Sequence, residues 1–200
     1  MESTGIVLDR DDLRRALVRI AHEIVEGNAD GDRVALVGIH TRGALMARRL
    51  QALIEERTDT PVPLGEVDIT FYRDDVGSRP ISDAPVVHSS HIDFALEGTT
   101  VVLVDDVLYT GRTVRAAIDS LFDYGRPDRV QLAVLVDRGH RELPIRPDYV
   151  GKNLPTSHDQ RVNVRLEESD GIDEVEIGPA GGKPPAGFSA GSTPMVTEAE

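Results

Sequence analysis

The chain of 200 residues contains no cysteine and no run of eighteen apolar residues. Without cysteine, disulfide bonds and thiolate chemistry are excluded. The absence of a long apolar run argues against a membrane-spanning helix, and the N-terminus MESTGIVLDRDD lacks the basic start and apolar stretch of a secretory signal. We therefore expect a cytoplasmic protein with no membrane partner.

Basic residues are scarce, with 22 Lys and Arg against 35 Asp and Glu. The formal net charge of −13 argues against a protein whose whole surface attracts nucleic acid, because phosphate binding needs clustered cations. One local basic face is still compatible with this charge. A hydrophobic content of 40% is sufficient for one domain of ordinary size with its own core.

Apolar periodicity divides most of the chain into alternating strands and helices. Helical spacing predicts helices at 9–26, 44–54 and 113–124. Continuous apolar runs predict buried strands at 33–39, 100–104 and 129–137, and weaker patterns predict a half-exposed strand at 64–72 and a late edge strand at 161–166. Short apolar strands that alternate with helices are typical of an α/β fold with an open, mainly parallel sheet flanked by helices.

Three segments depart from this pattern. A polar stretch between two apolar runs predicts a hairpin lid at about 66–90. The Pro- and Gly-rich residues after Arg138 predict an ordered crossing loop. Beyond about Gly178 the chain has too few apolar side chains to offset the entropy of ordering. We therefore expect one domain over 1–178 and a disordered tail over 179–200.

Three predicted loops carry charged residues where a structural turn needs only turn-forming residues. They are residues 40–43 (HTRG), 105–113 (DDVLYTGRT) and 137–140 (DRGH). Each loop follows an apolar strand. Because ligands of open parallel sheets bind beyond the carboxyl ends of the strands, the three loops together are the candidate site.

The middle loop has two chemically different halves. Residues 110–113 lie where a helix begins, so free backbone N–H groups, hydroxyls and the helix dipole suit a phosphate monoester. Asp105 and Asp106 would repel that phosphate, so we assign them to a neutral, hydroxyl-bearing part of the same ligand or to its metal. A ribose with its 5′-phosphate supplies both halves.

Two other interpretations of the acid pair exist. Aspartates at a strand end can simply cap the following turn. VVLVDD also resembles the first strand of response-regulator receiver domains, whose acid pair binds Mg²⁺. A receiver needs a phosphoacceptor Asp at the end of a later strand, and the region about fifty residues on, YVGKNLPTS, has no Asp at the end of an apolar run.

The motif VVLVDDVLYTGRT resembles the phosphoribosyl pyrophosphate (PRPP) signature of the type I phosphoribosyltransferases. More narrowly, VGIHTRG, GEVDITFYRDD and the run 126–157 resemble the family of bifunctional pyrimidine-operon regulators that are also uracil phosphoribosyltransferases. The likeness covers nearly all of residues 6–176. It implies the type I phosphoribosyltransferase fold with a small lid or hood.

The resemblance also implies a role for each loop. PRPP would be bound by Thr41, Arg42, Asp105, Asp106, Val107, Leu108, Tyr109, Thr110, Gly111, Arg112 and Thr113. Within this set, Asp105 and Asp106 would hold the ribose hydroxyls, and Arg42 would act on the pyrophosphate. Mg²⁺ would bridge pyrophosphate and ribose and could also bind the two aspartates. Asp137, Arg138 and the backbone near Val162 would frame the base, and Tyr72 and Arg73 would belong to the lid.

The implied reaction converts uracil and PRPP to UMP and pyrophosphate, by a displacement that needs no covalent nucleophile. The family further implies a homodimer or higher homo-oligomer and UMP-responsive binding of pyrimidine-operon leader mRNA. Candidate RNA contacts are Arg14, Arg15, Arg19, His140, Arg141, Arg146 and Lys152, which we expect to share one surface. Two alternatives stay open, namely a phosphoribosyltransferase for another base without RNA regulation, and an RNA-binding regulator with negligible catalysis.

Overall fold

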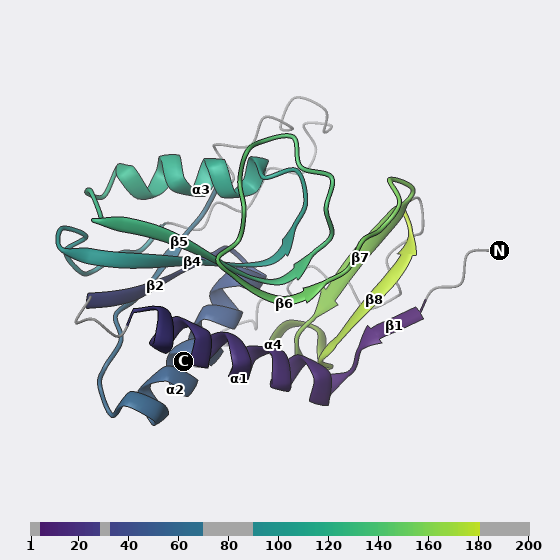
Figure 1. The fold of residues 1–200 in the computed structure, drawn as a ribbon, viewed down its shortest axis with the longest axis horizontal. Helices are drawn as coiled ribbons and strands as arrows, with labels where there is room; N and C mark the ends of the chain where they lie inside the picture. The colour runs from purple at the N-terminus through teal and green to yellow at the C-terminus, as the bar shows by residue number, and fades with distance from the viewer. Residues whose placement is uncertain (1–4, 29–32, 70–89, 181–200) are drawn as a thin grey trace, which may run out of the picture.

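The computed structural model describes residues 5–28, 33–69 and 90–180, which form two sheets and four helices (Figure 1). The larger sheet has five parallel strands in the order β3-β2-β4-β5-β6. They are β2 (Arg33–Ile39), β3 (Leu64–Val67), β4 (Thr99–Leu108), β5 (Arg129–Asp137) and β6 (Tyr149–Asn153). The predicted open parallel sheet is therefore confirmed.

A second, antiparallel sheet lies beyond the carboxyl ends of the parallel strands (Figure 1). It consists of β1 (Gly5–Leu8), β8 (Glu174–Pro179) and β7 (Gln160–Arg165), in that order. The short helix α4 (Glu167–Asp170) connects β7 to β8. We call these four elements the hood.

Helices cover both faces of the parallel sheet. Helices α1 (Arg10–Gly27) and α2 (Arg42–Thr58) pack on one face, and α3 (Arg112–Phe122) packs on the other (Figure 1). Successive residues of β4 alternate between the two cores, since Val101 and Leu103 belong to the α3 side while Val102 and Val104 belong to the α1 and α2 side. This double burial explains why residues 101–104 of β4 form an uninterrupted apolar run.

Helix α1 begins where its sequence predicts. The Asp9 carboxylate accepts a hydrogen bond from the backbone N–H of Asp12 at 2.8 Å, and the Asp12 carboxylate accepts one from the backbone N–H of Asp9 at 3.4 Å. This capping box satisfies N–H groups that have no partner within the helix.

Several predicted boundaries are wrong. Strand β4 does not end at residue 104 but continues to Leu108, because its pairing with β5 extends to the contact of Leu108 with Asp137. The expected crossing loop after Arg138 contains β6, which adds a fifth strand beside β5. The late strand β7 is an edge strand as expected, but of the hood sheet, whose partners β1 and β8 were not predicted.

Two predicted segments lie largely outside the described residues. Of the lid at about 66–90, the described part shows β3 ending at Val67 and an isolated antiparallel bridge between Glu66 and His91, while Tyr72 and Arg73 fall outside. Of the tail, β8 includes Pro179, and the backbone N–H of Ala180 donates to Asp159 at 2.7 Å. Regular structure thus extends past the predicted boundary, and the remaining domain limits stay a prediction. Within the described ranges, no helix is long and apolar enough to cross a membrane.

The contact between β2 and α2 gives a test of the fold. A Cβ atom on Gly38 would lie 2.3 Å from the Cα atom of Ala44. This is a backbone atom, so a change of side-chain rotamer cannot relieve the clash. We expect Gly38→Ala to lower the free energy of unfolding by about 1–3 kcal/mol, the usual cost of overpacking. Denaturant unfolding measures this loss. Gly5→Ala is the control, because a Cβ there meets nothing within 4 Å, and equal losses for both variants would contradict the tight contact.

Candidate active site

The three charged loops meet at one edge of the parallel sheet. Their strands β2, β4 and β5 are neighbours, so their carboxyl ends lie side by side. A Cβ on Gly43, after β2, would lie 2.3 Å from the Val104 carbonyl oxygen and 3.2 Å from the Cα of Asp105. The backbone N–H of Arg138, after β5, donates to the Leu108 carbonyl at 3.1 Å. The structure therefore brings the predicted loops together around the end of β4.

The two aspartates are held within β4 rather than in a loop. Asp105 is only 6% exposed, and its carboxylate accepts a hydrogen bond from the backbone N–H of Asp106 at 3.0 Å. The Asp106 carboxylate accepts one from the backbone N–H of Val107 at 2.9 Å. Burial raises the pKa of Asp106, and the nearby charge of Arg42 opposes this shift. An ionised carboxylate in this environment costs stability, which is typical of a functional site.

Arg42 is the first residue of α2 and faces both the acid pair and the hood. Its terminal nitrogen Nη2 donates to both carboxylate oxygens of Asp170, at 3.1 and 3.3 Å. Its Nε is buried and has no hydrogen-bond partner among the described residues. The described protein groups thus leave one donor of this guanidinium, the buried Nε, unused.

The start of α3 has the features of an anion site. Gly111 occupies the N-cap position with φ 93°, no side chain caps the helix among the described residues, and its first turn has no acid. The preceding Thr110 is fixed by its carbonyl, which accepts hydrogen bonds from the backbone N–H groups of Glu142 and Leu143 at 3.0 and 3.2 Å. The backbone N–H of Arg112 donates to the Thr110 hydroxyl at 3.4 Å, and the dipole at this helix start favours a phosphate. The Arg112 guanidinium pairs with Glu142 at 2.8 Å.

The loop after β5 is tied to the hood by Arg138. This side chain is 7% exposed, its Nε donates to the Thr156 hydroxyl at 3.0 Å, and its Nη2 donates to the Gln160 carbonyl at 2.8 Å. The guanidinium also stacks over the Tyr109 ring, 4.1 Å from its centroid, and burial lowers its pKa. Through Gln160, the loop is joined to β7, two residues before the predicted base contact at Val162. Asp137 accepts from the backbone N–H of Gly139 at 3.0 Å.

The seven candidate RNA contacts fall into two groups. The first group lies on α1 and β6 and consists of Arg14, Arg15, Arg19 and Lys152. Arg19 joins the two elements, because it donates to the Val150 carbonyl of β6 at 3.0 Å. Lys152 donates to the Val7 carbonyl of β1 at 3.4 Å. His140, Arg141 and Arg146 lie in the connection from β5 to β6, which reaches the start of α3 through Ile145 (Figure 1). The seven candidates therefore come from one helix, one strand and one loop.

Two members of the second group already have protein partners. Arg141 donates to the carbonyls of Tyr109 and Ile145 at 2.8 and 3.0 Å and pairs with Asp137, so its guanidinium braces the loop. The ring of His140 contacts the Thr156 carbonyl and lies 3.9 Å from the ring of His158. Arg14 and Arg146 are exposed and have no such partner among the described residues. The role of all seven stays a prediction.

The sequence interpretation missed the acids of the hood. Asp170 pairs with Arg42. Glu168 and Asp173 both pair with Arg49, which lies two turns further along α2. In sequence these acids form the run EESDGID, which is typical of a solvated surface. Only a charge match with arginines more than a hundred residues away could have identified them.

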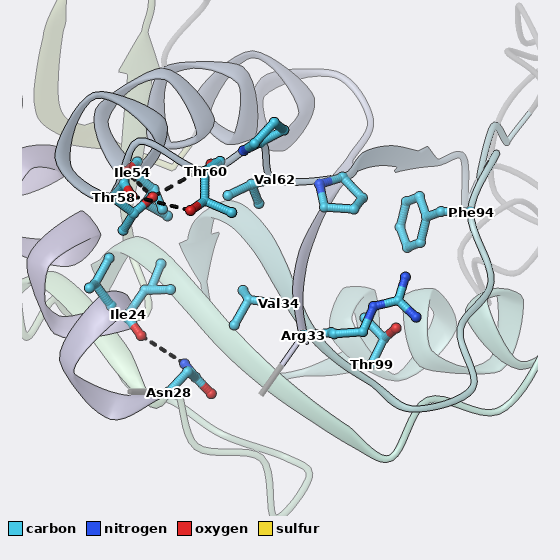
Figure 2. Close-up of a pocket in the computed structure, with 13 residues that line it drawn as sticks. Ile24, Asn28, Arg33, Val34, Ile54, Thr58, Thr60, Val62, Phe94 and Thr99 are labelled. Atoms are coloured by element: carbon cyan, nitrogen blue, oxygen red, sulfur yellow. Dashed lines mark hydrogen bonds between the residues drawn. The ribbon is translucent and has the colours of Figure 1, made fainter. Parts of the chain in front are cut away.

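A cavity of about 620 Å³ lies at the opposite edge of the sheet (Figure 2). It is lined by the first residues of β2 and β4, by the last turns of α1 and α2, and by Phe94. Arg33 is the charged residue of its described lining. Because the three charged loops lie at the carboxyl ends of the strands, this cavity is not part of the candidate site.

Comparison with known proteins identifies the family. A family model described as a phosphoribosyl transferase domain matches residues 3–168. The bifunctional protein PyrR of Roseiflexus sp. is 63% identical over 172 residues, which cover 86% of this chain and 93% of the relative. The chain belongs to the phosphoribosyltransferase family. The bifunctional protein PyrR of Bacillus subtilis is 53% identical over 88% of this chain and 98% of the relative, so the chain is a phosphoribosyltransferase of the PyrR type.

Solved structures agree with the phosphoribosyltransferase fold. A hypoxanthine phosphoribosyltransferase of Trypanosoma cruzi superposes with a TM-score of 0.65 at 17% identity, over 86% of this chain and 95% of the other. A hypoxanthine phosphoribosyltransferase of Staphylococcus aureus gives a TM-score of 0.58 at 21% identity, over 76% and 79% of the two chains. At these identities the likeness shows the fold alone.

The environment of Asp106 predicts a stability gain on neutralisation. Burial raises the pKa of the Asp106 carboxyl in the folded protein, so ionisation of this group disfavours the folded state. We expect Asp106→Asn to raise the free energy of unfolding by about 1 kcal/mol or more at neutral pH. The gain should be absent below the ordinary Asp pKa, grow as the pH rises from that value to the raised pKa, and stay constant above it.

Denaturant unfolding between about pH 4 and about pH 8 measures this gain. Asp119→Asn is the control, because that carboxylate is 53% exposed on α3 and its loss should change stability by no more than about 0.5 kcal/mol. A loss of stability in the Asp106 variant at neutral pH would show that the carboxylate is not penalised by burial.

Proposed function

We propose that the protein transfers the phosphoribosyl group of PRPP to uracil, giving UMP and pyrophosphate, and that it binds pyrimidine-operon leader RNA in response to UMP. The observation that carries the proposal is the continuous stretch from the acid pair of β4 to the uncapped start of α3, with Arg42 beside it. The high identity to proteins named bifunctional PyrR supports it.

Each part of the ligand has a chemically matched group. The carboxylates of Asp105 and Asp106 accept hydrogen bonds from the ribose 2′ and 3′ hydroxyls. The backbone and hydroxyls of residues 110–113 bind the 5′-phosphate, with Val107, Leu108 and Tyr109 as the backbone between the two halves. Thr41 and Arg42 contact the pyrophosphate. These positions orient the anomeric carbon toward the base, which is a large part of catalysis in a displacement reaction.

The residues present fit a Mg²⁺ ion that arrives with PRPP. Within the described ranges no cluster of three or more acid, histidine or cysteine side chains could hold a metal by itself. Mg²⁺ usually binds through one or two carboxylates together with substrate phosphates, and Asp105 and Asp106 can supply those carboxylates. Bound Mg²⁺ would neutralise charge on the pyrophosphate. Arg42 stabilises the same developing charge from the α2 side.

The base lies against the loop after β5. Asp137 and the backbone near Arg138 and Val162 frame the pyrimidine, and the Arg138 guanidinium keeps these elements together through the bonds to Thr156 and Gln160.

The lid residues Tyr72 and Arg73 exclude water while PRPP is bound. A homodimer or higher oligomer in the cytoplasm completes the proposal.

The transferase is tested with uracil, PRPP and Mg²⁺ by measuring pyrophosphate release. We expect the double variant Asp105→Asn with Asp106→Asn to lose at least about 100-fold in rate, because the ribose is no longer oriented. Its unfolding transition should remain cooperative, and Asp119→Asn should keep full activity. Hypoxanthine and orotate in place of uracil test the alternative bases. Undiminished activity of the double variant would refute the ribose assignment.

RNA regulation is tested by filter binding of the pyrimidine-operon leader from the same genome, with and without UMP. We expect retention that increases with UMP and weakens with salt. Arg14→Ala should reduce the salt slope by about one unit, since it removes one phosphate contact. Arg126→Ala, an exposed position before the amino end of β5 and away from the charged loops, should leave the slope unchanged. No retention at any ionic strength would leave an enzyme without RNA control.

A further inference from the structure

Arg42 joins the candidate active site to the hood. Its Nη2 donates to both carboxylate oxygens of Asp170, the last residue of α4. The two side chains are 31% and 20% exposed, so the pair is partly shielded from water but open to a ligand. The two residues are 128 positions apart in the chain, and the contact exists only because the hood folds back over α2.

The Asp170 carboxylate is fixed in an ionised state. Burial acts to raise its pKa, but hydrogen bonds from the Ser169 hydroxyl and the Leu166 backbone, together with Arg42, lower the pKa overall. The Ser169 and Leu166 bonds measure 2.6 and 3.0 Å. Asp170 therefore presents a stationary negative charge to Arg42 at neutral pH.

The rest of α4 is anchored independently of Arg42. Arg49, two turns further along α2, donates to Glu168 at 2.8 Å and to Asp173 at 2.7 Å. Arg10 pairs with Glu167. Loss of the Arg42 contact would therefore not detach the hood from the helices beneath it.

The pairing limits what Arg42 can offer an anion. Its charge is shared between Asp170 and the nearby Asp106, and its Nε is buried. The nitrogen that Asp170 occupies must be shared or surrendered before a phosphate oxygen can bind there. Pyrophosphate carries several negative charges and Asp170 carries one, so pyrophosphate can displace the Asp170 carboxylate from Arg42.

We infer that Asp170 is a latch on Arg42, which exchanges the Asp170 carboxylate for pyrophosphate oxygens when PRPP or pyrophosphate binds. Asp170 is thus a positioning residue that acts through Arg42 and lowers the affinity of the free protein for pyrophosphate. The inference rests on the proposed function and deepens it. It adds a contact in the hood that regulates anion binding at the transferase site.

The test uses inorganic pyrophosphate with Mg²⁺ as the probe and isothermal titration as the measurement. We expect Asp170→Asn to bind pyrophosphate roughly twofold to fivefold more tightly than the wild type, the range of a partly exposed ion pair. Glu168→Gln is the matched control, because it removes the same charge from the same helix but its partner is Arg49. Its affinity for pyrophosphate should match the wild type.

A second background separates a latch from simple repulsion. In the Arg42→Ala background, adding Asp170→Asn should leave the affinity for pyrophosphate unchanged, because the guanidinium that pairs with Asp170 is absent. Equal tightening in both backgrounds, or weaker binding by Asp170→Asn alone, overturns the latch. Cooperative unfolding of each variant confirms that it is folded.

UMP formation by the wild type tests the proposed function separately. An active wild type whose Asp170→Asn variant shows unchanged pyrophosphate affinity overturns the latch and leaves the transferase assignment standing. A wild type that neither forms UMP nor binds pyrophosphate overturns both.

Discussion

The candidate site depends on the parallel pairing of β4 with β2 on one side and β5 on the other. Parallel neighbours end at the same edge of a sheet, so three loops from distant parts of the chain meet there. Because β4 continues to Leu108, the aspartates are held by the sheet and keep a fixed direction relative to the start of α3. An acid pair in a free loop would have lost this orientation.

Around this edge, arginines connect elements that the sheet alone would leave apart. Arg138 joins β5 to the hood through Thr156 and Gln160, and Arg42 and Arg49 join α2 to the acids of α4. The planar guanidinium suits this task because it presents several donors in fixed directions. In an acidic chain with few cations, each of these arginines has a structural partner, so ligand binding at Arg42 must compete with an existing contact.

Much of the parallel sheet and of the middle loop could be predicted. The strands β2 and β5 have the predicted limits because both faces are largely buried and most of their side chains are apolar. The strand β6 was missed because its residues YVGKN are mixed in polarity, and it is ordered by pairing with β5. The strands β1 and β8 have no strong pattern of their own, and their pairing with each other and with β7 creates the hood sheet.

The sequence by itself determined the order Asp105 to Thr113, in which carboxylates precede a helix start. That arrangement is local, since a strand end and the following helix start are only a few residues apart. Tertiary structure decided which charges meet across the fold, including Arg42 with Asp170 and Arg138 with the start of β7. Such pairs depend on the strand order and on the fold of the hood, because an exposed acid run has many possible partners until those elements are in place.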